Sequence, residues 1–223
     1  MTLLHAPYTL WHLSYVVIGA CLAPALPVGR TGLAVLAFFL AVGVGAHALD
    51  ELRGRPLQTR ISDRVLAAVA ASSIAAASVV GVLVAVDFDL WLLAFVAFGA
   101  FVVCAYNLEL FGGRLHSDAW FALSWGAFPL LTGYFTAAGA ITAEALLAAA
   151  FAALLSAAQR TLSTPVRRLR RQVAFVSGAL ELPDGTRETV DRDALTAAPE
   201  TALRLLAAAT VALAVALLVL RLS

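Results

Sequence analysis

Residues 32–57 read GLAVLAFFLAVGVGAHALDELRGRPL. This segment is almost wholly apolar up to Asp50, and a helix of about 20 apolar residues crosses the hydrocarbon core of a bilayer. It then becomes strongly charged, with Glu51, Arg53 and Arg55 in close succession. Charged side chains are costly deep in a bilayer and are readily placed at its surface. The stretch therefore predicts a transmembrane helix that ends at a polar membrane surface.

The composition of the whole chain is typical of a membrane protein. Hydrophobic residues make up 62% of the 223 residues and charged residues 13%, whereas a soluble domain has about 25% charged residues. Apolar segments of spanning length predict seven transmembrane helices, over residues 9–28, 32–50, 65–86, 90–108, 119–138, 142–160 and 201–221. We therefore expect an all-α membrane protein with no nucleic-acid partner.

The distribution of arginine predicts the orientation in the membrane. Every arginine except Arg30 and Arg221 follows an even-numbered span or begins the seventh one, and the chain contains no lysine. Because positively charged loops stay in the cytoplasm, we expect a cytoplasmic N-terminus and an external C-terminus in a prokaryotic cell membrane. We interpret the arginines of residues 167–171 as part of this topogenic signal, in contact with anionic lipid headgroups.

The segment between the sixth and seventh spans is not membrane-like. Residues 173–191 contain two strand-like runs separated by Pro183-Asp-Gly185, a sequence typical of a turn. We therefore expect a small cytoplasmic β-hairpin. The chain is predicted to consist of three regions: a six-helix membrane bundle with a polar cytoplasmic pocket (1–165), a cytoplasmic basic segment with the hairpin (166–199) and a C-terminal transmembrane helix (200–223).

Most polar side chains of the predicted bundle lie near its cytoplasmic face. Since the even-numbered spans end on that side, their polar ends are expected to converge in one pocket. His47, Asp50 and Glu51 have the spacing that places side chains on one face of a helix. The other candidate residues are Arg53, Arg55, Tyr106, Asn107, Glu109, His116 and Arg160.

Two chemistries fit this set of residues. In the first, Asp50 and Glu51 hold Mg²⁺, which is commonly bound by one or two carboxylates together with substrate phosphates. Arginines such as Arg53, Arg55 and Arg160 then bind a diphosphate through paired N–H donors. In the second, a transition metal such as zinc or iron binds to imidazole and carboxylate ligands. Its ligand set is His47, Glu51, Glu109 and His116.

The chain resembles the UbiA superfamily of membrane prenyltransferases. The resemblance rests on Asp50-Glu51 followed by Gly54-Arg-Pro-Leu57 and Arg60-Ile-Ser62, and on the stretch from Tyr106 to Tyr134. It covers about residues 9–165. The chain departs from the family in having one aspartate in the first motif and seven predicted spans instead of about nine. Residues 159–165, where a second acidic motif is expected, contain no acid.

The resemblance implies a UbiA-like bundle that transfers a prenyl or polyisoprenoid group from a lipid diphosphate to an acceptor. It further implies that Asp50 and Glu51 hold magnesium and that Arg55 and Arg160 contact phosphate. The remaining candidates, His47, Arg53, Tyr106, Asn107, Glu109 and His116, would then bind substrate. Two alternatives stay open: a transition-metal-dependent membrane enzyme, and a non-catalytic lipid-binding relative, which the missing second acidic motif favours. The sequence specifies neither the acceptor nor the oligomeric state.

Overall fold

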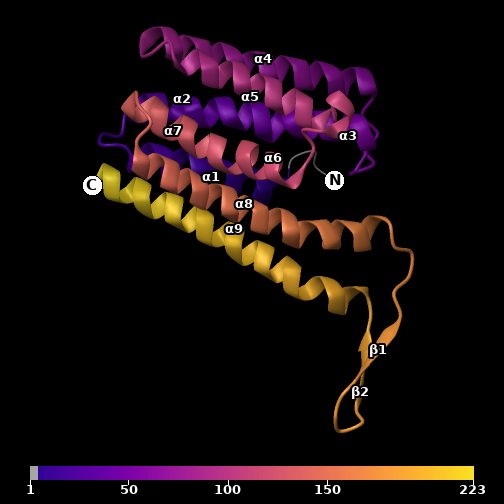
Figure 1. Cartoon of the computed structure of the whole chain (residues 1–223). Helices are drawn as coiled ribbons and strands as arrows, with labels where there is room; N and C mark the ends of the chain where they lie inside the picture. Colours follow the sequence, from indigo (N-terminus) through magenta and orange to yellow (C-terminus); the bar gives the residue numbers. More distant parts are fainter. Residues whose placement is uncertain (1–4) are drawn as a thin grey trace.

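The computed structural model describes residues 5–223. This part of the chain forms seven helical rods, several of them continuous over more than one type of helix, and a small hairpin (Figure 1). The rods are α1 (Ala6–Leu22); α2, η1 and α3 (Val28–Phe38, Phe39–Ala46 and His47–Gly54); α4 (Asp63–Asp87); α5 (Leu92–Asn107); α6, η3 and α7 (Asp118–Ala122, Leu123–Ala127 and Phe128–Ala138); α8 (Ala143–Arg171); and α9 (Arg192–Leu222). A 3-10 turn, η2 (Phe111–Gly113), lies between α5 and α6.

Each predicted span corresponds to one of these rods, so the predicted number of helices is confirmed. Four rods, Val28–Gly54, α4, α8 and α9, are long and apolar enough to cross a membrane, and α5 is a shorter apolar helix. The first rod ends at Leu22, earlier than predicted, because Pro24 and Pro27 follow closely and cannot continue a helix. The last two rods extend well beyond their predicted spans on the side that leads to the hairpin.

The bundle is held together by close contacts between helix backbones. Gly19 of α1 lies against the carbonyl oxygen of Leu130, and Gly133 of α7 lies against the carbonyl oxygen of Val16, with no room for a side chain at either glycine. Small residues permit such contacts between apolar helices. Helix α1 packs mainly on α7 and α9, whereas α4 and α5 form an outer layer on the side of α2 (Figure 1).

Two of the rods contain a π-helical segment, which the sequence analysis did not predict. Phe39–Ala46 (η1) lies between α2 and α3, and Leu123–Ala127 (η3) lies between α6 and α7. A π-helical turn contains an extra residue and changes which side chains and carbonyl groups face a neighbouring helix. In η3 the change comes just before Pro129, whose nitrogen has no hydrogen to donate to the helix.

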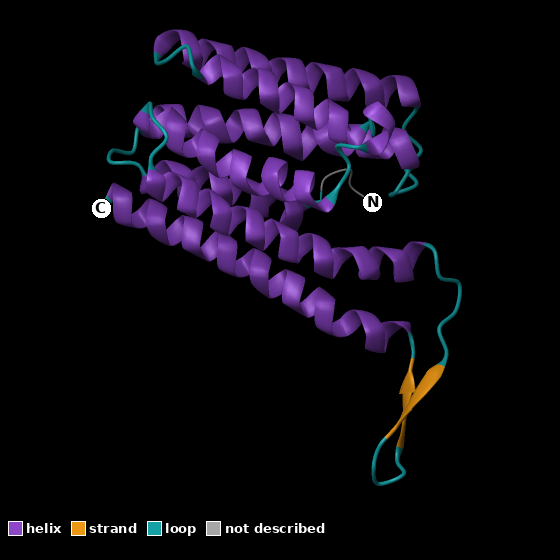
Figure 2. Ribbon diagram, in the orientation of Figure 1, coloured by secondary structure: helices purple, strands orange, loops and turns teal. Residues whose placement is uncertain are grey.

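The predicted hairpin is confirmed. Its strands β1 (Gly178–Glu181) and β2 (Arg187–Val190) pair antiparallel, with Glu181 opposite Arg187. The Asp184 carboxylate accepts a hydrogen bond from the Thr186 amide, which lowers its pKa. Figure 2 shows that the hairpin projects away from the helices. It lies at the same end of the molecule as the start of α1 and the end of α3, whereas the C-terminus lies at the opposite end (Figure 1).

Candidate functional site

Polar and aromatic side chains from five of the rods gather inside the bundle, toward the hairpin end. We call them the inner polar cluster and define it as Tyr8, His12, His47, Tyr106, Phe121, Ser124, Trp125, Gln159 and Arg160. Its rings are in close contact. The Tyr8 ring lies 4.3 Å from that of His12 and 5.7 Å from that of His47, measured between centroids. The Tyr106 and Trp125 rings are 4.4 Å apart.

The two histidines of the cluster are each held by a backbone carbonyl of a π-helical segment. Nδ1 of His12 lies 2.6 Å from the carbonyl oxygen of Trp125, in η3. Nδ1 of His47 lies 3.0 Å from the carbonyl oxygen of Val42, in η1. The π-helical segments thus orient two imidazole rings that come from different rods.

Five buried polar atoms of the cluster have no hydrogen-bond partner among residues 5–223. They are Nε2 of His12, the Tyr106 hydroxyl, Oγ of Ser124, Nε1 of Trp125 and Oε1 of Gln159. Buried polar groups in proteins are normally hydrogen-bonded, and each one left without a partner costs about 1–3 kcal/mol. Such a concentration in one place indicates that water or the polar part of a ligand completes the cluster.

Positive charge lies beside these rings. Arg160 donates from Nε to Oδ1 of Asp118 at 2.8 Å, and its guanidinium carbon lies 5.4 Å from the centre of the Phe121 ring. Asp118 begins α6 in the first turn, where the helix dipole favours an acid, and Ser117 caps that turn. Arg167 lies seven residues beyond Arg160 and therefore near the same face of α8.

The charged side chains around the cluster act on its two tyrosines. Asp50, Arg160 and Arg167 each exert an electrostatic effect on the phenol oxygens of both Tyr8 and Tyr106. Two helices that are distant in sequence, α3 and α8, therefore bring their charges to the same aromatic group. The site combines two guanidinium groups, two carboxylates (Asp50 and Asp118) and two phenols at the hairpin end of the bundle.

The two acids of the predicted motif, Asp50 and Glu51, lie in different environments. The Glu51 side chain is fully buried, with 0% exposure. Its carboxylate accepts hydrogen bonds from the amides of Leu57 and Thr59, at 2.9 and 2.7 Å, and from the Thr59 hydroxyl at 2.8 Å. Asp50 is exposed and makes no hydrogen bond or ion pair with any residue in the described range 5–223. Of the two acids, only Asp50 is exposed at the surface of the helix.

Arg55 also binds the loop that follows α3. Its guanidinium donates to the carbonyl oxygens of Thr59 and Ile61, at 3.3 and 2.6 Å, and pairs with Asp63 at the start of α4. Together with Glu51, it fixes residues 55–61 in place. The predicted roles of Glu51 in metal binding and of Arg55 in phosphate binding gain no support from this geometry and stay predictions.

The remaining predicted residues lie at the same end of the bundle but do not all meet. Arg53 and Glu109 form an exposed ion pair, with 3.4 Å between Nη2 of Arg53 and Oε2 of Glu109. The His116 ring stacks on Tyr106 at 4.3 Å, and Asn107 donates to the carbonyl of Val103 at 2.7 Å. Within residues 5–223 no three His, Cys, Asp or Glu side chains form a group that could hold a metal ion. The alternative set with His47, Glu51, Glu109 and His116 therefore does not form a centre in this structure.

An apolar groove lies between the inner and outer helices. Its walls come from α2 and η1, α4, α5, and η3 and α7, and it contains about 780 Å³ of empty space, part of which is open to the surroundings. Almost all of its lining is apolar, for example Ala41, Val103 and Phe128. Ser124 and Trp125 also line it, and both belong to the inner polar cluster. The groove and the cluster therefore share residues.

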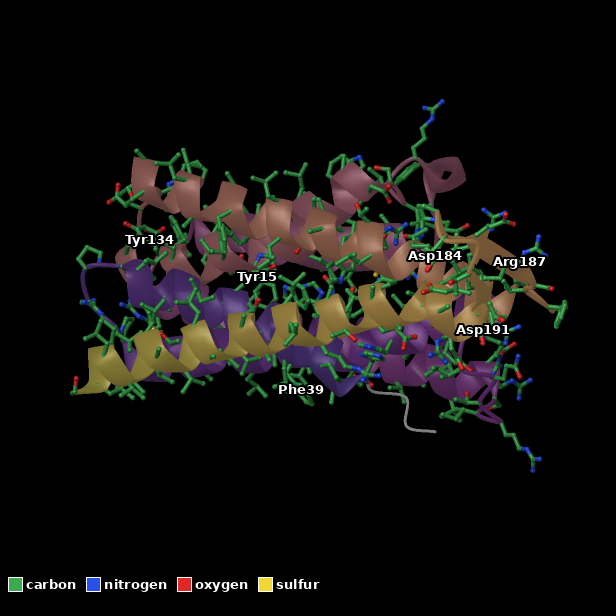
Figure 3. The ribbon with its side chains drawn as sticks, turned by 90° about the horizontal axis from the view of Figure 1, so that it is seen from below. Tyr15, Phe39, Tyr134, Asp184, Arg187 and Asp191 are labelled. Atoms are coloured by element: carbon green, nitrogen blue, oxygen red, sulfur yellow. The ribbon has the colours of Figure 1, made fainter. Side chains whose placement is uncertain are left out.

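Figure 3 shows how polar residues are distributed along the bundle. Asp184, Arg187 and Asp191 lie at the hairpin end, Tyr134 lies toward the other end, and Tyr15 lies between them. The Tyr15 hydroxyl accepts from Nε1 of Trp11 at 2.6 Å and from Ser156 at 3.3 Å. Tyr15 lies farther from the hairpin end, and its hydroxyl, unlike the unpartnered atoms of the cluster, has hydrogen-bond partners within the protein.

The sequence patterns did not single out several residues of this site, including Tyr8, His12 and Trp125, and they indicated only a topogenic role for Arg167. One signal was present for His12, because an ionisable residue within an apolar span is by default a candidate for function. No local pattern could have paired His12 with the carbonyl of Trp125, 113 positions away. In comparisons with known proteins, no family model, curated protein or solved structure matches the chain.

Proposed function

We propose that this chain is an integral membrane protein with a UbiA-like seven-span bundle that binds an isoprenoid diphosphate near the cytoplasmic surface. The apolar surface of the helices supports the insertion of the bundle into a membrane. Leu83, Leu147, Leu205 and Leu220 each have more than 60% of their surface exposed, which suits contact with lipid rather than water. The arginine distribution supports an orientation with the N-terminus and the hairpin in the cytoplasm and the C-terminus outside.

The lengths of the last two rods agree with this orientation. At 1.5 Å per residue, α8 is about 43 Å long and α9 about 46 Å. Both exceed the roughly 30 Å hydrocarbon core. Their excess length lies on the hairpin side, where α8 carries Arg167, Arg168, Arg170 and Arg171. These arginines would then lie at the level of the lipid headgroups.

The main support for the proposed ligand is that the apolar groove adjoins the inner polar cluster, with Ser124 and Trp125 common to both. An isoprenoid tail needs an apolar groove between helices, and a diphosphate needs cationic donors at its end. Arg160 and Arg167 supply paired N–H donors suited to phosphate oxygens, and the phenols of Tyr8 and Tyr106 can donate as well. Because Trp125 lines the groove and also contacts Tyr106, one amphiphilic molecule can occupy both places.

Asp50 is the acid that fits a magnesium ion at this position. Mg²⁺ is commonly held by one or two carboxylates together with the phosphates of its substrate, and Asp50 acts electrostatically on both tyrosines of the cluster. When bound, magnesium would neutralise part of the charge of the diphosphate. Glu51 is excluded from this role in our proposal because its carboxylate oxygens accept hydrogen bonds from the loop.

The proposed reaction is transfer of the isoprenoid group to an acceptor. The bond between the isoprenoid carbon and the diphosphate oxygen breaks, and its electron pair leaves with the diphosphate. Arg160 and Arg167 would stabilise the charge that develops on the leaving oxygens, which is a large effect in a site with little water. Burial of the rings around Phe121 limits the access of water to the reacting carbon.

The proposal is tested by the binding of farnesyl diphosphate to the full chain in lipid nanodiscs, with farnesol as the uncharged control. We expect saturable binding of the diphosphate at one molecule per chain and much weaker binding of farnesol. Equal affinity for the two compounds would show that the arginines do not recognise the headgroup. Addition of Mg²⁺ is expected to strengthen the binding of the diphosphate in the wild-type chain and not in the variant Asp50→Asn.

A second candidate function is lipid binding without reaction. It is favoured by Glu51, whose engagement with the loop leaves a single free acid, and by the absence of any acid in residues 159–165. The two functions are separated by incubating the chain with farnesyl diphosphate, Mg²⁺ and a membrane extract as the source of acceptor. A transferase releases inorganic diphosphate under these conditions, whereas a binding protein returns the farnesyl diphosphate intact.

A further inference from the structure

The hydrogen-bond partner of His12 determines which of its ring nitrogens carries the hydrogen. Nδ1 lies 2.6 Å from the carbonyl oxygen of Trp125, and because a carbonyl oxygen can only accept, Nδ1 must carry the hydrogen. In a neutral imidazole the second nitrogen is then an acceptor. Nε2 of His12 is such a nitrogen, and it has no partner among residues 5–223. The side chain is 1% exposed, so the bare acceptor is deeply buried.

The unpartnered atoms of the inner polar cluster indicate the chemistry of a suitable ligand. His12 Nε2 and Gln159 Oε1 only accept hydrogen bonds, whereas Trp125 Nε1 only donates. An anionic oxygen cannot satisfy a bare imidazole nitrogen, because it has no hydrogen to donate. A hydroxyl group has a hydrogen to donate, so it can satisfy Nε2 of His12. The cluster therefore fits an uncharged, hydroxyl-bearing molecule.

This acceptor nitrogen lies close to the proposed headgroup site without being part of it. The His12 ring is 6.1 Å from the Phe121 ring, and the Arg160 guanidinium lies over that same ring. Tyr8 lies beside His12 and is also subject to the charges of Arg160 and Arg167. Phe121 thus contacts both Arg160, which suits an anion, and His12, which suits a hydroxyl.

We infer that the inner polar cluster contains a second subsite, for the hydroxyl group of an uncharged molecule whose O–H is directed at Nε2 of His12. The inference rests on the proposed function, in which this molecule is the acceptor. During transfer the acceptor oxygen forms a bond to the isoprenoid carbon, the carbon–oxygen bond to the diphosphate breaks, and the acceptor proton moves to Nε2. A histidine placed in this way acts as a general base.

The test uses nitrogen-15 NMR of the full chain labelled on histidine, in lipid nanodiscs, with octanol and its methyl ether as probes. The alcohol donates a hydrogen bond and the ether cannot, although both are apolar amphiphiles. For the free protein we expect a pyridine-type resonance for Nε2 of His12. Octanol should shift it upfield toward the position of a hydrogen-bonded nitrogen, and the ether should leave it unchanged. The His47 resonance should move less, because the proposed hydroxyl is directed at Nε2 of His12.

Assignment does not depend on a single variant. His12→Gln should remove the resonance, and if that variant does not fold, variants of His5, His47 and His116 assign it by elimination. A protonated Nε2 in the free protein, an equal response to alcohol and ether, or no response to either would each overturn the inference. The result is distinct from the test with farnesyl diphosphate, since a failure there leaves the histidine tautomer and its response to alcohol unchanged.

Discussion

Two groups of polar side chains lie at the hairpin end of this bundle, and they differ in how far the protein satisfies them. Around Glu51, the loop of residues 55–61 provides the carboxylate with three donors. In the inner polar cluster, five buried polar atoms lack any partner within residues 5–223. Because buried polar groups are normally paired, we interpret the first group as part of the scaffold and the second as the place where a ligand binds.

The largest expected effect comes from breaking the satisfied group. Glu51→Ala leaves the Leu57 and Thr59 donors without their acceptor. Hydrogen bonds to a charged group contribute about 1.5–3 kcal/mol each, and partial access of water to the loop reduces their sum. We therefore expect the free energy of unfolding to fall by about 3–4 kcal/mol, measured by denaturant titration in detergent.

Glu51→Gln is the matched control, since it retains an oxygen acceptor and should lose less stability than Glu51→Ala. Binding of farnesyl diphosphate by the folded fraction of either variant should stay close to that of the wild type. If stability were unchanged while magnesium-dependent binding disappeared, Glu51 would be a metal ligand and our distinction between the two groups would be wrong.

Breaking the second group is expected to affect binding and to leave the fold intact. The double substitution Arg160→Gln and Arg167→Gln removes two charged donors from the proposed headgroup site. At about 1.5–3 kcal/mol for each hydrogen bond to a charged group, the affinity for farnesyl diphosphate should fall by at least about 100-fold. Arg168→Gln is the control, because Arg168, unlike Arg167, is not among the charges that act on Tyr8 and Tyr106, and its side chain makes no hydrogen bond or ion pair within residues 5–223.

The groove provides a test of the tail rather than the headgroup. Ala100 lines the groove, and Ala100→Phe would fill part of it. Each buried CH₂ group contributes about 0.8 kcal/mol, so displacing the end of a farnesyl tail should weaken binding by about 10-fold. Dimethylallyl diphosphate, which has a much shorter tail, should bind the variant and the wild type equally. A loss of the same size for both compounds would mean that the tail lies elsewhere.

The smallest effect concerns the ion pair between Asp118 and Arg160. The Asp118 side chain is 80% exposed, and exposed ion pairs contribute only about 0–1 kcal/mol. Asp118→Asn should free Arg160 for the headgroup and remove a negative charge from its vicinity. We expect a rise in affinity for farnesyl diphosphate of about 2- to 5-fold at low salt, which disappears at high salt. A fall in affinity would mean that Asp118 positions Arg160 for binding.

Local patterns in the sequence predicted much of the fold. The seven helical rods follow from the length of the apolar runs, and the hairpin follows from the turn residues Pro183 to Gly185 between two short strand-like runs. These features depend on residues that are neighbours in the chain. The π-helical segments were missed because their hydrogen-bond pattern leaves no mark on the apolar composition of Phe39–Ala46 or Leu123–Ala127.

The site was harder to predict because its chemistry depends on contacts between distant segments. The sequence correctly draws attention to the charged end of α3, but whether Glu51 binds a ligand or the loop depends on the path of residues 55–61. In the same way, His12 is a single histidine in an apolar helix until α1 packs against η3. Arg167 belongs to a basic run in the sequence, and only its place along α8 brings it near Tyr8 and Tyr106.

The most direct test of our central claim is mass spectrometry of the lipids that copurify with the chain from its native membrane. We predict that the wild-type protein retains an isoprenoid diphosphate at one molecule per chain. The double variant of Arg160 and Arg167 should lose this lipid, while the variant Arg168→Gln should keep it. Recovery of no isoprenoid diphosphate with the folded wild-type protein, or its equal retention by the double variant, would contradict the assignment of the inner polar cluster as its binding site.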